Sequence, residues 1–113
     1  MKISKLLEIS QLQLTSLNQI AGLDEEFRGA YAGDLLSDVM GNAKAGQIWI
    51  TMQTHKNVAA IAGLKDMAAI IIVGNQQAAP DMLEQCSIEN IPLFSTPLRS
   101  YEVSGIIFNG VNY

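Results

Sequence analysis

The chain is short of cysteine. Cys86 is the only one among its 113 residues. A lone cysteine cannot form a disulfide within the chain, which excludes a disulfide-stabilised secreted fold and favours a reducing compartment. We interpret Cys86 as a packed thiol rather than a reactive one, because it falls in an apparent helix.

Charged residues and long apolar runs are also scarce. Charged side chains make up 16% of the chain and the net charge is −4, so no basic surface for nucleic acid is expected. The longest apolar run, residues 67–73, has seven residues; a membrane span needs roughly 20. Polar residues interrupt residues 1–7 too early for a signal peptide. We therefore expect a cytoplasmic protein whose partners include neither nucleic acid nor a membrane.

Apolar side chains, by contrast, are plentiful at 49% of the chain. A chain of this length forms one domain and buries roughly 60–70% of its unfolded surface. Such a small domain has limited interior for so many large side chains, so part of them should lie in a subunit interface. We predict a single domain over residues 1–113 that forms a homodimer, with residues 27–32 or the region of Trp49 near the interface.

The most informative stretch is residues 48–57, an apolar run that ends in five polar residues. Ile-Trp-Ile-Thr-Met predicts a buried strand, Gln-Thr-His-Lys-Asn a tight turn, and the pattern from 58 to 64 a helix. The stretch contains the only Trp and the only His, Trp49 and His55. We expect Trp49 in the core or in an interface. In an open α/β sheet, ligands usually bind at turns that follow the carboxyl ends of strands.

The order of strand, turn and helix recurs along the chain. Residues 68–73 are wholly apolar and predict a strand buried on both faces. Strands that each lead into a helix predict an α/β fold, a single-domain layered sandwich with a largely parallel central sheet flanked by helices. We expect parallel strands at about 48–52, 69–73 and 92–95. The other predicted elements are strands at 12–16 and 27–32, a turn at 22–26, and helices at 4–8, 34–40, 57–64, 80–90 and 98–108.

Polar residues at two predicted helix starts suggest N-caps. Ser4 is expected to cap the first helix, and Asp34 the helix that ends near Met40. Asp34 and Asp38 are four residues apart and would then share a helix face, which could hold a divalent ion. An N-cap beside an exposed acidic face is the simpler interpretation, so no metal and no cofactor is predicted.

Three predicted strands deliver polar turns to one edge of the sheet. Amide and hydroxyl groups, backbone N–H groups and helix N-termini would converge there, which suits a small anionic ligand or a nucleotide. The alternative is that Thr54 and Asn57 cap a helix and the other residues only hold the turns together. The candidate ligand-binding residues are Gln53, Thr54, His55, Asn57, Asn75 and Thr96, with Asp34 and Ser37 facing the same edge.

His55 also raises the alternative of catalysis. A histidine in a turn could act as an acid or base near neutral pH, so a small enzyme that handles phosphoryl or acyl groups is a second hypothesis. No catalytic partner for His55 stands at a recognisable spacing. Ser37 is not in the context of a nucleophile elbow. We therefore predict no catalytic residue and no enzyme.

Three segments in order resemble the DRTGG domain family. They are residues 32–40 (AGDLLSDVM), 46–51 (GQIWIT) and 53–57 (QTHKN), and the resemblance covers nearly the whole chain. It implies a fold similar to the N-terminal domain of the HPr kinase, and a regulatory or dimer-forming module without established catalytic activity. The chain departs from the family after the third strand, where Val73-Gly74-Asn75 replaces a Thr-Gly-Gly-like turn. It also lacks the G-x-x-x-x-G-K-[ST] loop that kinase chemistry would need.

Three hypotheses on function remain open at this point. The first is a non-catalytic regulatory or dimerisation module that binds a small anionic ligand, or a metabolic or signalling protein. The second is the small enzyme that uses His55. The third is a purely structural partner in a metabolic complex. The apolar excess, the polar turns and the resemblance favour the first.

Overall fold

The molecule is built on one five-stranded sheet. The computed structural model describes residues 1–18 and 23–110. The strand order is β1-β5-β4-β3-β2. Neighbouring strands from β2 to β5 pair in parallel, and only β1 is antiparallel. The predicted α/β class is therefore confirmed. The strands are β1 (Thr15–Ser16), β2 (Ala30–Ala32), β3 (Ile48–Thr51), β4 (Ala69–Ile72) and β5 (Leu93–Ser95).

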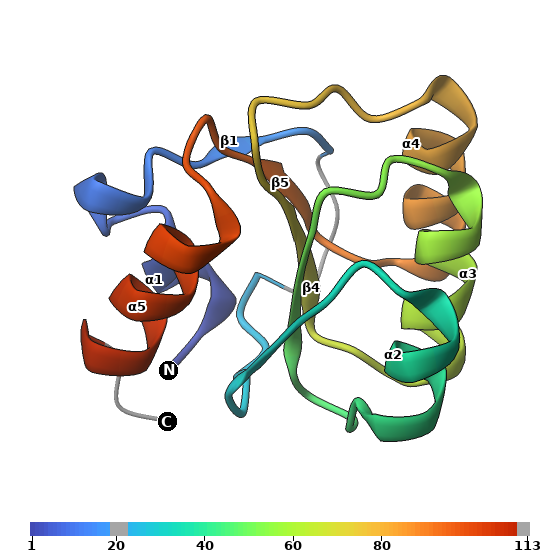
Figure 1. Ribbon diagram of the computed structural model, residues 1–113, viewed down its shortest axis with the longest axis horizontal. Coiled ribbons are helices and arrows are strands. Elements are labelled where there is room, and N and C mark those ends of the chain that lie inside the picture. The colour runs from blue at the N-terminus through green and yellow to red at the C-terminus, as the bar shows by residue number, and fades with distance from the viewer. Residues whose placement is uncertain (19–22, 111–113) are drawn as a thin grey trace.

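Helices cover both faces of this sheet (Figure 1). Apolar side chains of α1 and α5 pack on one face, and those of α2, α3 and α4 pack on the other. A short 3-10 turn, η1 (Ser10–Leu12), lies on the side of α1 and α5. The helices are α1 (Ile3–Leu6), α2 (Leu36–Asn42), α3 (Lys56–Leu64), α4 (Pro80–Glu89) and α5 (Ser100–Gly110).

The central strands are apolar on both sides because both sides are covered. Every residue of β3 and of β4 is buried. Successive side chains of a strand point to opposite faces, so Ile71 packs towards α5 whereas Ile70 and Ile72 pack towards α3 and α4. β3 and β4 pair in parallel, with Ile48 opposite Ala69 and Thr51 opposite Ile72, so their carboxyl ends meet at one edge.

Trp49 belongs to the core rather than to an exposed interface. Its side chain is fully buried on the face of α2 and α3. The indole Nε1 donates a hydrogen bond to the carbonyl oxygen of Gly33 at 2.9 Å. This bond satisfies the one polar atom of the ring and ties the end of β2 to the middle of β3.

The first segment differs from the prediction in its details. Ser4 is the second residue of α1 and not its N-cap, which is Lys2. The N–H groups of Ile3 and Ser4 instead donate to backbone carbonyls of the segment at 23–25. The turn predicted at 22–26 is present from residue 23, and Gly22 lies outside the described residues. The strand expected at 12–16 is reduced to β1, because η1 takes up residues 10–12 and Gln13 is left-handed.

The start of α2 also differs from the prediction. This helix begins at Leu36, and its N-cap position is Leu35. Asp34 lies outside it, because the carboxylate bonds to the next strand instead of to the N–H groups of its own helix. Asp34 and Asp38 therefore do not share a helix face. No helix in the described part of the chain has the length and apolar character to cross a membrane.

Candidate functional site

The polar turns of the chain gather at the carboxyl edge of the sheet, which is the upper edge in Figure 1. Four parallel strands end there, and each continues into a turn that leads to a helix. We use the name carboxyl edge for residues 33–35, 52–57, 73–79 and 95–99. The predicted site residues lie in these turns, except Asn57, which is the second residue of α3, and Ser37, which is in α2.

Asp34 and Gln53 are brought together by a cluster of hydrogen bonds. Oδ1 of Asp34 accepts from the hydroxyl of Thr51 at 2.8 Å and from the backbone N–H of Met52 at 2.7 Å. The amide of Gln53 donates to the backbone oxygen of Asp34 at 3.0 Å. These bonds fix the turn after β2 against the turn after β3. The carboxylate therefore helps to hold the rim of the site.

The N-terminus of α3 is open. His55 occupies the N-cap position, and no side chain makes a capping hydrogen bond there. The interpretation of Thr54 and Asn57 as caps of this helix is therefore wrong. Thr54 instead accepts the N–H of Ala79 through its backbone oxygen, at 3.1 Å. The backbone N–H groups of Lys56 and Asn57 have no acceptor among the described residues, which is typical of an uncapped first turn.

Thr96 faces the interior, although its backbone contributes to the same edge. Its side chain is buried, and the hydroxyl donates to the carbonyl oxygen of Leu12 at 2.7 Å. The same hydroxyl oxygen accepts the N–H of Leu98 at 3.2 Å. Asn75 lies beside it, because its backbone N–H donates to the carbonyl oxygen of Thr96 at 3.1 Å. The Asn75 side chain is exposed, so of this pair only Asn75 offers a side chain to a ligand.

Ser37 stands apart from the other predicted residues. It is exposed in the first turn of α2, and no hydrogen bond joins it to a described residue of the carboxyl edge. The neighbouring polar contact on α2 belongs to Asp38, which accepts the hydroxyl of Tyr31 at 2.5 Å. This bond, with desolvation and the Asp38 charge as smaller causes, raises the pKa of Tyr31 above its ordinary value.

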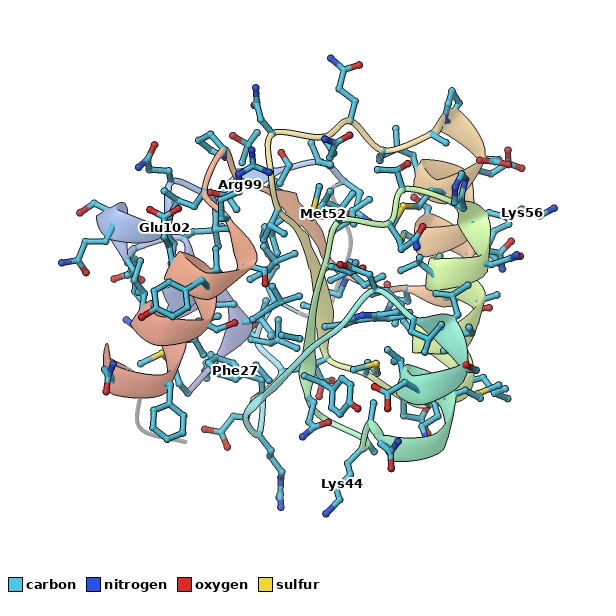
Figure 2. All side chains as sticks on the ribbon, in the orientation of Figure 1. Phe27, Lys44, Met52, Lys56, Arg99 and Glu102 are labelled. Carbon is cyan, nitrogen blue, oxygen red and sulfur yellow. The ribbon has the colours of Figure 1, made fainter. Side chains whose placement is uncertain are left out.

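Arg99 is a residue of this edge that sequence reasoning missed. Gly74 turns at a φ of +78°, and a Cβ added there would lie 3.4 Å from Nη1 of Arg99 and 3.3 Å from Cε of Met52. The guanidinium therefore lies over the glycine of the turn after β4. Figure 2 shows Arg99 and Met52 at this edge. Arg99 forms no ion pair with any described residue. The sequence placed Arg99 in the predicted helix at 98–108, whereas α5 begins only at Ser100, so Arg99 belongs to the turn after β5.

The side chain of Arg99 takes no part in capping α5. The backbone N–H of Arg99 donates to Oε1 of Glu102 at 3.0 Å, which is the contact that the glutamate makes in a capping box. Only the backbone of Arg99 takes part in this contact. The guanidinium thus remains available as a cation at the carboxyl edge, over the turn after β4.

The chemistry that these groups support is binding. Uncapped helix N–H groups and a guanidinium attract negative charge, and the exposed amides and imidazole offer further hydrogen bonds. No hydrogen bond among the described residues joins His55 to a nucleophile or to an orienting carboxylate. Within residues 1–18 and 23–110, no cluster of three or more His, Cys, Asp or Glu side chains is placed to hold a metal ion.

Comparison with known proteins gives a likeness of fold. No family model matches the sequence. No curated protein matches it either. The structure is similar to the regulatory region of a Clostridium perfringens pyrophosphatase, which comprises CBS and DRTGG domains and was solved with its activator, diadenosine tetraphosphate. The TM-score is 0.74 at 15% identity, over 91% of this chain and 45% of that one. The chain thus has the fold of part of a regulatory region that contains a DRTGG domain, and it spans less than half of that region.

Proposed function

We propose that the protein is a non-catalytic regulatory module that binds a small anionic ligand, such as a nucleotide or another phosphate ester, at the carboxyl edge. The observation that carries this proposal is that two anion-attracting features lie along the same edge of the sheet. These are the uncapped N-terminus of α3, with His55 at its N-cap, and the guanidinium of Arg99 over Gly74, which has no ion-pair partner within residues 1–18 and 23–110.

The local charges support an anionic ligand over a cationic one. A helix N-terminus carries roughly half a positive charge, and a guanidinium presents a planar fork of donors that suits phosphate oxygens. The nearby carboxylate of Asp34 already accepts two hydrogen bonds, and that of Glu102 accepts one. The overall charge of −4 is therefore compatible with local attraction of an anion.

The fold likeness supports a regulatory role. The similar pyrophosphatase region regulates an enzyme and was solved with a nucleotide activator. Because this chain spans less than half of that region, we infer that it acts as one module of a larger assembly. We further propose that it works as a homodimer, and that a metabolic or signalling protein receives its signal.

The test of ligand binding is thermal unfolding with diadenosine tetraphosphate, ATP and inorganic pyrophosphate. A ligand at 100 times its dissociation constant adds about 2.7 kcal/mol to the free energy of unfolding. Arg99→Gln should reduce this gain, and its helix start should survive because the backbone N–H still reaches Glu102. The matched control is Arg28→Gln, since Arg28 is exposed but packs its stem on Gly46, away from the carboxyl edge. No stabilisation of the wild type by any of the three ligands would refute the proposed anion site.

A further inference from the structure

β2 is an edge strand of the sheet, and no other strand of residues 1–18 and 23–110 pairs with its outer side. The carbonyl oxygen of Gly29 accepts from Ile48, and the N–H of Gly33 donates to Ile50. Since strand residues alternate in the direction of their backbone groups, Ala30 and Ala32 direct their N–H and C=O groups away from β3. Neither residue makes a further backbone hydrogen bond to the described chain. This edge also lacks the proline or lysine that commonly protects one.

A groove runs between this edge and α5. Its volume is about 960 Å³, with Ala30, Ala32 and Ile50 on the side of the sheet. The other wall is α5, from Tyr101 to Gly110. Glu102 is the one charged residue among those that line the groove, and its carboxylate accepts the N–H of Arg99. The groove is therefore mainly apolar and nearly free of net charge.

The wall of the groove carries two aromatic side chains and a notch. Tyr101, Gly105 and Phe108 are spaced by four and three residues, so they lie along one side of α5. Tyr101 is 89% exposed and Phe108 is 76% exposed, the two highest values among the large apolar side chains of the described chain. A Cβ added at Gly105 would meet no atom within 4 Å. Along this side of α5, the open space at Gly105 thus lies between the large side chains of Tyr101 and Phe108.

We propose that this face pairs with a second copy of the chain about a two-fold axis. The two β2 strands would pair antiparallel, with Ala30 of one copy opposite Ala32 of the other. The two α5 helices would then lie antiparallel on the same face of the joined sheet, with Phe108 of each copy over Gly105 of the other. This interface rests on the proposed self-association and specifies where it occurs.

A second copy fits this face because the face is complementary to itself. A two-fold interface needs donors opposite acceptors and large side chains opposite gaps within one surface. The outward groups of β2 and the sequence Tyr101, Gly105, Phe108 meet both needs. Antiparallel α5 helices also place the partly positive N-terminus of one copy near the partly negative C-terminus of the other. The nearly uncharged groove keeps the repulsion between two acidic chains low at this face.

A stable pair sets a requirement on the area of this face. A specific interface hides roughly 800 Å² on each partner, which is about 13% of the 6115 Å² surface of this chain. The interface proposed here combines a strand edge with one side of the eleven-residue helix α5. It would cover the two most exposed large apolar side chains of the described chain.

Sedimentation of the full chain tests this interface. The wild type should sediment as a dimer of twice 12.2 kDa. Gly105→Arg and Phe108→Asp should each shift it to the monomer at the same concentration, while circular dichroism stays unchanged. The matched controls are Gly41→Arg, at another helical glycine with open space, and Ile88→Asp, at a side chain 67% exposed on α4. Both controls should remain dimeric.

A cysteine cross-link tests the strand register. Tyr31 is the central residue of β2, so the two copies of Tyr31→Cys would face each other across the two-fold axis. This variant should form a disulfide-linked dimer under mild oxidation, whereas Thr15→Cys at the opposite edge of the sheet should not.

The outcomes separate this interface from the rest of the proposed function. A dimer that survives both Gly105→Arg and Phe108→Asp would overturn the interface and leave self-association standing. A wild type that sediments only as a 12.2 kDa monomer at about 100 µM would overturn both the interface and the proposed self-association. Pyrophosphate binding, measured on the same variants, reports on the carboxyl edge independently of either result.

Discussion

The turns after β3 and β5 both contain polar residues at the carboxyl edge, but these residues have different roles. The turn after β3 ends in Thr54 and His55, and the turn after β5 contains Thr96. Thr96 is buried, and its hydroxyl joins Leu12 to Leu98. His55 is exposed and makes no capping bond. The comparison shows that the polarity of a turn does not reveal its role, which depends on whether its polar atoms are already bonded inside the molecule.

Thr96→Val should have the largest effect on stability. The substitution keeps the shape of the side chain but leaves the carbonyl of Leu12 and the N–H of Leu98 without their partner. Buried groups left unpaired cost about 1–3 kcal/mol. Urea unfolding should therefore show a loss of this size. Thr96→Ser is the control, since it keeps the hydroxyl; an equal loss in both variants would mean that packing, not hydrogen bonding, is the cause.

Asp34→Ala should destabilise the protein less. The carboxylate accepts from Thr51 and Met52, but Asp34 is exposed and water can replace part of both bonds. We expect a loss of about 1 kcal/mol in urea unfolding, near the mean for one hydrogen bond. Asp34→Asn keeps an oxygen acceptor and should lose less. If the two variants proved equally unstable, the charge of Asp34 rather than its acceptor geometry would matter.

Cys86, like Thr96, is buried, but its thiol can lose a proton. Burial, with a smaller contribution from the charge of Glu89, raises the pKa of its thiol to about 12. The folded protein therefore keeps this proton when the unfolded chain has lost it. The resulting stabilisation is fully present below the unfolded pKa of about 8.5 and disappears as the pH rises towards 12.

This pH dependence can be measured as a difference. The free energy of unfolding of the wild type should fall more steeply between pH 9 and 11 than that of Cys86→Ala. Parallel curves would contradict the raised pKa. A thiol reagent at pH 8 should also label Cys86 slowly in the folded protein and rapidly in urea, because the side chain is buried.

His55→Ala should have the smallest effect on stability and a clear effect on binding. An exposed turn residue without a capping bond contributes within about 0.5 kcal/mol to folding. The same substitution should weaken the stabilisation by pyrophosphate, since it removes a donor beside the open N-terminus of α3. A large loss of stability would mean that His55 resembles Thr96 and holds the turn together. Unchanged pyrophosphate binding would remove His55 from the site.

Much of the fold could be predicted from the sequence because burial leaves a pattern. The apolar run of β4 predicted a strand covered on both faces, that of β3 predicted a buried strand, and both strands are wholly buried. The strand–turn–helix order gave the parallel arrangement, and with it the edge where the turns meet. The prediction was less accurate at the first residues and at the start of α2, where long-range bonds replaced local capping.

The sequence by itself determined the α/β class and the edge at which polar residues gather, because both follow from local periodicity and chain direction. Only the tertiary structure decided that the Thr96 hydroxyl is bonded inside, that Asp34 joins two turns, and that Arg99 lies over Gly74. Those facts depend on atoms that are far apart in the chain, such as Thr96 and Leu12. No local pattern encodes such a contact, because its energy arises only when packing brings the two groups together.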